Sequence, residues 1–382
     1  MSSDEPYFSR RQLIGAGGLA ALGAWYVRPS RFTSDQSLDR PIPQDTWPTF
    51  GRDASRSGYA LTSDAPTEGV RVAWKAEVGE PYLALPALVG EDTVYTTTQN
   101  ELVALDAEEG TERWRFGEEF IQGGPAVVGD TAYYSAGVSL FAVSGDYAKW
   151  KFETNSSFEE ILSVGNTIFI SSYYEDGTKL IALDAESGVP RWMSKPGLRP
   201  LAYADEILVG TGEYGLVAVN ATNGERGWHL SKPGLPGDTA RFGFGPTIAG
   251  GMLFGGSERL YAVDIHSGKV AWTAGSEGGM AVSDGETVYR SSIDGITAFD
   301  AADGTQQWQT STGLNLTGSL ALSDEILYAG IEGGLAGVNP ETGKRRVRFE
   351  SKPNSRSVGQ PAITGNRVYV GVGTKMVALE EP

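Results

Sequence analysis

Two adjacent carboxylates, Glu159 and Glu160, stand out in the stretch from Glu153 to Ile161. Carboxylates can hold a metal ion through oxygen or move a proton, and a nearby arginine can balance a negative ligand. Two candidate arginines are Arg199 and Arg241. Aromatic residues in the neighbouring variable loops complete the candidate patch: Tyr173, Tyr174, Phe242 and Phe244. This mixture suits a small polar ligand or a peptide, and solvated loops with local packing are the simpler alternative.

Composition narrows the chemistry that such a patch could perform. The chain has no Cys, which excludes disulfides, thiolate nucleophiles, zinc–thiolate sites and c-type haem attachment. The net charge is −17 and the pI is about 4.6, so nucleic acid is not an expected partner. The 21 Arg outnumber the 10 Lys. An acidic surface with few Lys resembles the halophilic proteins of salt-loving archaea, and an ordinary acidic surface is the alternative.

An internal repeat indicates the elements that position the patch. The unit LVALDAEEGTERW, from Leu102 to Trp114, combines an alternating strand, an Asp, a turn ending in Gly and a Trp. It recurs as IALDAESGVPRW, VAVNATNGERGW, YAVDIHSGKVAW and TAFDAADGTQQW. A shortened copy ends at Trp150, a degraded copy has Val347 in the Trp position, and KMVALEEP stops before the turn. Equivalent small residues lie 36 to 44 residues apart, the period of a four-stranded propeller blade.

The last repeat has the apolar strand but not the Trp-containing strand that follows it in other repeats. Near the N-terminus, one Trp-containing strand has no apolar strand before it. VRVAWKAEVG, around Trp74, has no apolar partner strand before it. Strand 70–78 is therefore predicted to pair with the C-terminal strand 375–380, which closes the ring and hides a sheet edge. The predicted fold is all-β, an eight-bladed β-propeller of four-stranded antiparallel blades.

The recurrent tryptophans could stack on sugars or bases, or they could pack between blades. Their regular recurrence favours packing, because a binding site would be local. Seven residues receive this blade-docking role: Trp74, Trp114, Trp150, Trp192, Trp228, Trp272 and Trp308. The short, uniform hairpin turns are expected on one face of the ring. The variable loops, and with them the candidate patch around blades 3 to 5, are expected on the other.

These repeats resemble the PQQ-binding-like β-propeller family, whose docking motif is A-x-D-x-x-x-G-x-x-x-W, from Trp47 to Pro382. WPTFGRDASRSGYA, residues 47–60, is similar to the lead-in segment of such proteins. The family includes quinoprotein alcohol dehydrogenases, with quinone and calcium in the channel. It also includes non-catalytic scaffolds, such as the eight-bladed lipoprotein of the bacterial outer-membrane assembly machine. The fold alone does not choose between them.

The resemblance to the dehydrogenases implies an alternative function, oxidation of an alcohol or sugar with PQQ and calcium. Glu159 or Glu160 would then be a metal ligand, and Arg199 or Arg241 the cation over the quinone. Against this, the chain is short for that class and lacks the Cys pair that those enzymes place beside the quinone. We therefore expect no cofactor, no metal and no catalytic residue. The expected protein is a monomeric, non-catalytic scaffold that contacts protein partners or a small polar ligand at its loop face.

The N-terminus carries an export address. SRRQLIGAGGLAALGAWYV places Arg10 and Arg11 before an apolar stretch and resembles a twin-arginine signal. Its apolar run, residues 13–27, is short for a spanning helix of about 20 residues, and both cleavage and retention as an anchor stay open. The predicted organisation is a signal or possible anchor over 1–29, a linker over 30–46 and the propeller over 47–382. The predicted location is outside the cytoplasm, either secreted or anchored at the outer face of the cytoplasmic membrane.

Three sequons would be available to a glycosylation system on an exported protein. They begin at Asn155, Asn220 and Asn315. The motif is short and also occurs by chance, so each is a possible modification site.

Overall fold

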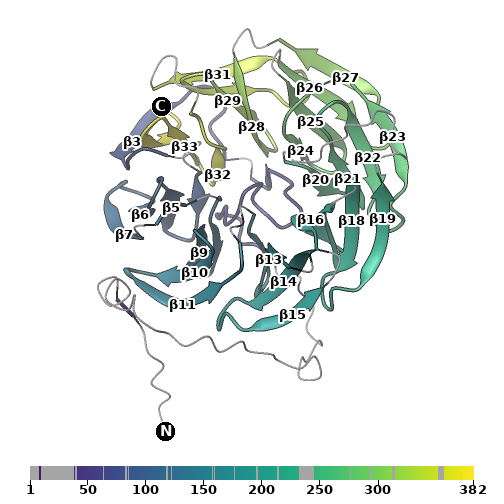
Figure 1. Cartoon of the computed structure of the whole chain (residues 1–382). Helices are drawn as coiled ribbons and strands as arrows, with labels where there is room; N and C mark the ends of the chain where they lie inside the picture. Colours follow the sequence, from purple (N-terminus) through teal and green to yellow (C-terminus); the bar gives the residue numbers. More distant parts are fainter. Residues whose placement is uncertain are drawn as a thin grey trace.

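The computed structural model shows eight β-sheets arranged in a closed ring (Figure 1). It describes residues 8–9, 38 and 41–382, apart from 63, 82–83, 85, 118, 122, 157, 159, 176, 195–196, 213–214, 232–244, 276, 293–294, 312–314 and 352–356. Over these residues the secondary structure is all β, and no helix is present that could cross a membrane. The predicted eight-bladed propeller is confirmed.

The first four blades follow one another along the chain, each from its inner to its outer strand. Blade 1 is β4 (Leu88–Val89), β5 (Thr93–Thr97), β6 (Leu102–Asp106) and β7 (Glu112–Phe116). Blade 2 is β8 (Ala126–Val128), β9 (Thr131–Ala136), β10 (Ser139–Ser144) and β11 (Tyr147–Glu153). Blade 3 is β12 (Leu162–Val164), β13 (Thr167–Tyr174), β14 (Gly177–Asp184) and β15 (Pro190–Ser194). Blade 4 is β16 (Arg199–Ala204), β17 (Ile207–Gly212), β18 (Gly215–Asn220) and β19 (Arg226–Ser231).

Blades 5 to 8 complete the ring. Blade 5 is β20 (Thr247–Ala249), β21 (Met252–Gly255), β22 (Leu260–Asp264) and β23 (Val270–Ala274). Blade 6 is β24 (Ala281–Ser283), β25 (Thr287–Ser292), β26 (Gly295–Asp300) and β27 (Gln306–Thr310). Blade 7 is β28 (Leu316–Ser323), β29 (Leu327–Ile331), β30 (Gly334–Val338) and β31 (Arg345–Glu350). Blade 8 is β32 (Ala362–Thr364), β33 (Arg367–Val372), β34 (Lys375–Glu380) and, from the N-terminal part, β3 (Arg71–Glu77). Two short strands extend blades 2 and 7, β1 (Phe8–Ser9) beside β11 and β2 (Tyr59–Ala60) beside β28.

Blade 8 is split between the two ends of the chain. β3 pairs antiparallel with β34, and Trp74 lies opposite Ala378. The same register sets Trp114 opposite Ala104 in blade 1. In both blades a bulge follows the small residue, so the Trp projects in the same way round the ring. The closure predicted from strands 70–78 and 375–380 is confirmed.

The apolar core is divided into wedges between neighbouring blades. One buried cluster joins blades 4 and 5 through residues such as Leu216 and Tyr261, and another joins blades 5 and 6 through Phe254 and Val288. The largest cluster runs from blade 7 through the split blade to blades 1 and 2. Because each blade buries both faces against its neighbours, its inner strands are almost continuously apolar.

Most wedges are fixed by one repeated contact between a Trp and the next blade. Trp192 of blade 3 donates its indole N–H to the carbonyl of Ala221 in blade 4, at 3.2 Å. Gly224, in the same turn, has a φ of +73°, and a Cβ there would lie 2.7 Å from the Trp192 ring. Only glycine combines this backbone conformation with such close approach. The same pairing of indole bond and underlying glycine occurs for Trp74, Trp150, Trp228, Trp272 and Trp308.

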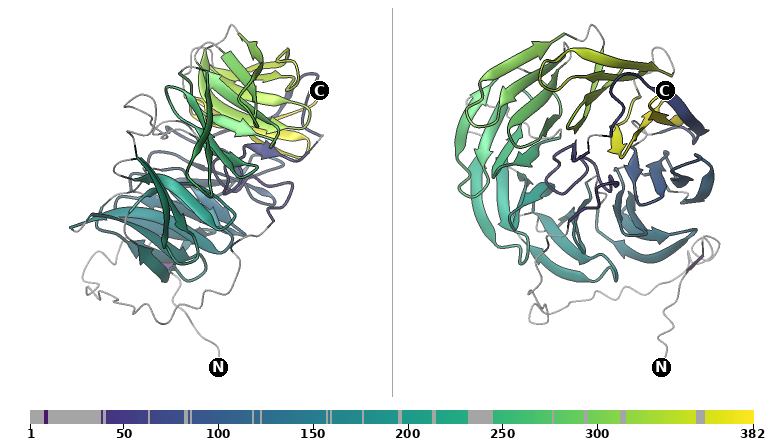
Figure 2. Two further views of the ribbon diagram at one scale, coloured as in Figure 1. Left: turned by 90° about the vertical axis from the view of Figure 1, so that its right-hand side faces the viewer. Right: turned by 180° about the vertical axis from the view of Figure 1, so that it is seen from behind.

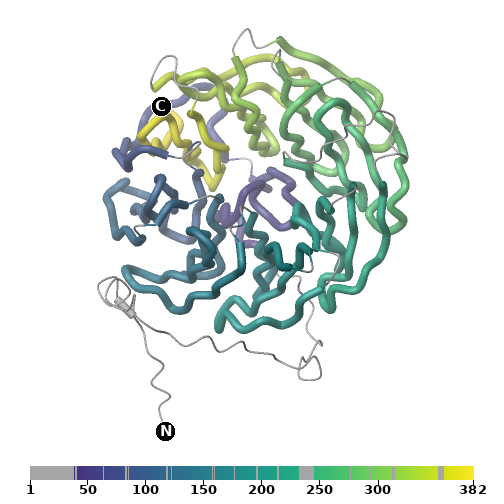
Figure 3. The backbone as a smooth tube through the Cα atoms, viewed as in Figure 1, coloured from purple at the N-terminus to yellow at the C-terminus, as the bar shows by residue number. Residues whose placement is uncertain are grey.

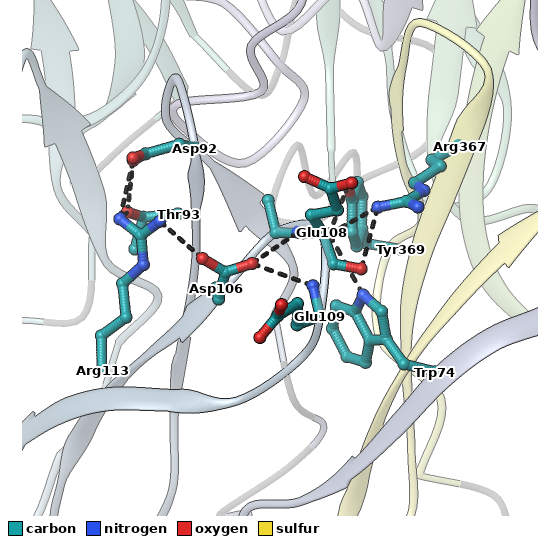
Figure 4. A network of polar contacts seen from close by, with 10 residues as sticks. Trp74, Asp92, Thr93, Asp106, Glu108, Glu109, Arg113, Arg367 and Tyr369 are labelled. Atoms are coloured by element: carbon teal, nitrogen blue, oxygen red, sulfur yellow. Dashed lines mark hydrogen bonds and ion pairs between the residues drawn. The ribbon is translucent and has the colours of Figure 1, made fainter.

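The contact between blades 8 and 1 closes the ring and carries additional bonds (Figure 4). The carbonyl of Ala107 accepts from Trp74 Nε1 at 3.1 Å, from Arg367 Nη1 at 3.0 Å and from Tyr369 Oη at 3.1 Å. Asp106 holds this turn by accepting from the N–H groups of Glu108 and Glu109, both at 2.9 Å. One rigid turn of blade 1 thus receives three donors from the strands at both ends of the chain.

Candidate functional site

Residues 47–60, here called the collar, run round the inside of the ring (purple in Figures 1 and 3). Their carbonyls accept hydrogen bonds of 2.7 to 3.0 Å from the inner strands of six blades. The donors are the N–H groups of Val89, Val127, Tyr203, Ile248, Ser283 and Leu322. The collar begins at the fully buried Trp47, which bridges Val89, and ends in β2. Seen from behind, it also lies in the middle of the ring (Figure 2).

Two charged side chains of the collar, Arg56 and Asp53, form hydrogen bonds with neighbouring groups. Arg56 is buried, stacks over Phe50 and bonds Glu160 Oε2 through Nη2 at 2.8 Å. Asp53 accepts from Ser55 Oγ at 2.7 Å and from the N–H of Ser57 at 2.9 Å, and also from the Ser57 hydroxyl. Glu160 of the predicted patch therefore forms an ion pair with Arg56 of the collar. No local sequence pattern predicts this ion pair.

The other described members of the predicted patch come from blades 3 and 4. Tyr173 and Tyr174 end β13, with Tyr173 62% exposed and Tyr174 stacked on Lys179 at 4.6 Å. Arg199 begins β16 and is half-buried. Glu159, Arg241, Phe242 and Phe244 lie outside the described residues. The structure thus brings Glu160 to Arg56, and Tyr173 is the more exposed of the two described aromatic residues of the patch.

Sequence reasoning missed two exposed apolar residues on segments that are connected to Tyr173 by hydrogen bonds. Phe120 is 41% and Val138 is 44% exposed. The Phe120 carbonyl accepts from the Gly137 N–H, and the Val138 carbonyl accepts from both the N–H and the hydroxyl of Thr154. Thr154 Oγ1 also bonds the Ser156 carbonyl, and the Ser156 hydroxyl accepts from the Tyr173 N–H at 2.8 Å. The three apolar side chains therefore stand on one connected set of loops over blades 2 and 3, here called the apolar row.

The residues in the middle of the ring do not fit the quinone and calcium of the dehydrogenases. Three carboxylates lie on or against the collar. Asp53 and Glu160 have the partners given above, and Asp324 accepts from the Tyr59 hydroxyl. Across the described part of the chain, no group of three or more His, Cys, Asp or Glu side chains is arranged to hold a metal. We derive no chemical step through such a cofactor.

The three sequon asparagines differ in their surroundings. Asn220 Oδ1 caps its turn by accepting from Thr222 and Asn223, and Asn315 donates to Glu332 Oε2 at 2.7 Å. Asn155 is exposed between β11 and β12. Arg10 and Arg11 of the expected export signal lie outside the described residues.

Fold and repeat chemistry together define a class of protein, the β-propeller built from tryptophan-docked PQQ-like repeats. Models of one family match residues 63–156, 138–241 and 236–381. The chain belongs to that family, PQQ_2, described as outer membrane protein assembly factor BamB.

Individual relatives and structures agree with this assignment. The outer membrane protein assembly factor BamB of Bordetella pertussis is 24% identical over 339 residues, covering 81% of this chain and 76% of that protein. The crystal structure of BamB from Moraxella catarrhalis matches 81% of this chain and 99% of its own, with a TM-score of 0.65 at 17% identity. The quinohemoprotein alcohol dehydrogenase of Comamonas testosteroni matches 88% of this chain and 80% of its own, with a TM-score of 0.69 at 12% identity. At these identities the two structures show a shared fold only.

Proposed function

We propose that this protein is a non-catalytic propeller scaffold that works outside the cytoplasm by holding protein partners on the loop face of blades 2 and 3. The observation that carries the proposal is the apolar row, which exposes Phe120, Val138 and Tyr173 on hydrogen-bonded loops. Exposed aromatic and apolar side chains on a rigid frame are the usual anchors of a protein interface.

Two further observations support a scaffold over an enzyme. The family and its curated relatives are named as assembly factors of the outer membrane. The middle of the ring holds the collar, bonded to six of the eight blades. We extend to this chain the general role of a partner-binding scaffold, reached by export through the twin-arginine signal around Arg10 and Arg11. A small polar ligand at the remaining patch residues, Arg199 and Arg241 included, is the secondary form of the same proposal.

The test compares the apolar row with exposed apolar residues elsewhere in the ring. A triple variant, Phe120→Ser with Val138→Ser and Tyr173→Ser, is set against Val189→Ser with Met193→Ser, whose residues are 52% and 45% exposed. Each protein is used to capture partners from solubilised membranes of the producing cell, with quantification by mass spectrometry. The control should retain the wild-type partners, and the triple variant should lose them by about tenfold or more. Equal capture by both variants would remove the apolar row from the proposal.

Quinone binding separates the scaffold from the dehydrogenase alternative. The purified protein is titrated with PQQ and calcium and followed by absorbance and by melting temperature. We expect no saturable change. Saturable binding together with dye-linked alcohol or sugar oxidation would replace the scaffold with an enzyme.

A further inference from the structure

The collar omits blade 3. Ser163 occupies in β12 the position that Val127 holds in β8 and Tyr203 in β16, since each pairs with the second residue of the following strand. Val127 and Tyr203 donate their N–H groups to collar carbonyls at 2.7 Å. For Ser163 the described residues supply no acceptor. Blade 8 also has no such bond, but it lies between the two ends of the collar, whereas blade 3 lies along its course.

The collar does not follow the inner strand of blade 3, because the collar makes a turn at this place. Between Pro48, bonded to blade 2, and Ala54, bonded to blade 4, Gly51 and Arg52 adopt φ values of +73° and +71°. The Gly51 N–H is drawn to Gln360 Oε1, next to blade 8, at 2.8 Å. The turn therefore points away from Ser163 and leaves a space beside β12.

That space is a pocket of about 630 Å³, within the range of small-ligand sites. One side is the collar turn, and the other sides are the first turn of blade 1 and the inner strands and first turns of blades 2 to 4. Leu38 and residues 41–43 close its outer side. The wall is therefore part apolar and part main chain.

Two donors that line this pocket have no acceptor among the described residues. One is the Ser163 N–H, and the other is Nε of the buried Arg52, which bonds the Tyr59 carbonyl through Nη1. The exposed carboxylates Glu91 and Asp205 line the same pocket, and Asp205 lies 3.5 Å from His266. The pocket thus offers one main-chain donor and one arginine donor inside, and negative charge at its edge.

We propose that this pocket binds an extended, positively charged peptide segment of a partner protein. Its main-chain carbonyl accepts from the Ser163 N–H, as collar carbonyls accept from the equivalent amides of six blades. Its lysine or arginine side chains face Glu91 and Asp205, and small apolar side chains contact Leu38 and Ile42. Main-chain pairing with an exposed strand edge is a general mode of peptide recognition. The site lies at the first turns of blades 1 to 4 and does not depend on the apolar row.

The test uses the full chain and two acetylated tetrapeptide amides, one alternating lysine with valine and one alternating glutamate with valine. Binding is measured by calorimetry. Ser163→Pro removes the one N–H without touching the sheet ladder, because that group faces the pocket. Val127→Pro is the matched control, since it removes an equivalent amide that is bonded to Pro48. Glu91→Lys changes only the exposed charge.

We expect saturable binding of the lysine peptide and about tenfold weaker binding of the glutamate peptide. Ser163→Pro should keep the wild-type melting temperature and bind the lysine peptide about tenfold more weakly. Val127→Pro should have a lower melting temperature. Glu91→Lys should weaken the binding of the lysine peptide. This variant tests the proposal even if Ser163→Pro fails to fold. Equal binding of both peptides, unchanged binding to the Ser163→Pro and Glu91→Lys variants, or binding of acetate but of neither peptide would overturn it.

Discussion

Two wedges hold a tryptophan at the same repeat position but with different neighbours. Trp192 lies between blades 3 and 4, and Trp114 lies between blades 1 and 2. Trp192 meets a four-residue turn with a carbonyl at Ala221 and a glycine at Gly224. Trp114 faces the shortened hairpin at Gly145, where a Cβ would contact only Tyr147, at 3.8 Å. Within the described chain no acceptor serves the Trp114 indole N–H, and its ring packs on Tyr95 instead. The docking contact therefore needs both the tryptophan and the glycine-containing turn of the next blade.

The wedge between blades 7 and 8 shows the same rule from the other side. Blade 8 has no hairpin turn between its two outer strands, because β34 and β3 come from opposite ends of the chain. Blade 7 correspondingly has Val347 opposite Gly337, where other blades have Trp opposite Ala. The chain passing from the collar to β3 contacts blade 7 here: Ala65 belongs to the same buried cluster as Val347, and the Pro66 carbonyl accepts from the Tyr328 hydroxyl. The tryptophan is therefore absent from the one blade whose neighbour has no hairpin turn to receive it.

The largest effect should separate docked from undocked tryptophans. Trp192→Ala removes a packed ring and its hydrogen bond, and we expect a loss of about 3–5 kcal/mol in the free energy of unfolding. Trp114→Ala removes a half-buried ring without that bond, and should cost at least about 1 kcal/mol less. Urea unfolding of both variants measures the difference. Equal losses would mean that the glycine turn adds nothing to the contact.

A smaller effect should follow from restoring the missing tryptophan. Val347→Trp forces a large ring into the buried cluster that already holds Ala65, and should destabilise the protein by about 1–3 kcal/mol. Val347→Leu, which adds only one methylene, is the control and should stay within about 1 kcal/mol of the wild type. The melting temperature of each variant decides the matter. A more stable Val347→Trp protein would show that this wedge has room and that its valine has another cause.

The ring could be predicted from the sequence because its repeats are local and in register. The unpaired strand around Trp74 and the unfinished last copy predicted blade 8 before any coordinates. The shortened turn at Gly145 and the substitution at Val347 were visible in the sequence too. Their shared cause was not, because each docked tryptophan contacts the glycine of the following unit and not that of its own.

The candidate site was less accessible to sequence reasoning. The ion pair of Arg56 with Glu160 joins residues that are 104 apart in the chain, and no repeat pattern relates a lead-in segment to a loop of blade 3. Phe120 and Val138 are ordinary apolar residues whose exposure depends on the loops around them. The gap in the collar at Ser163 depends on a turn set by Gly51 and Arg52. Tyr173 and Arg199 stay predictions for the binding face.

The smallest effect concerns the turns that receive the tryptophans, which are capped by Asp in most blades and by Asn in blades 4 and 7. The hydrogen bond from Arg113, followed by the N–H of Glu109, holds the pKa of Asp106 below its usual value. A carboxylate whose pKa is lower in the folded than in the unfolded chain stabilises the fold above the unfolded pKa of about 3.9. This stabilisation is lost as the pH falls through the folded pKa. Asp106→Asn should therefore cost less than about 1 kcal/mol at neutral pH and flatten the fall in melting temperature between about pH 5 and pH 2. Asn220 already accepts the same turn N–H groups without a charge, so Asn220→Asp should steepen that fall. A pH profile that neither substitution moves would show that the turn caps act through geometry alone.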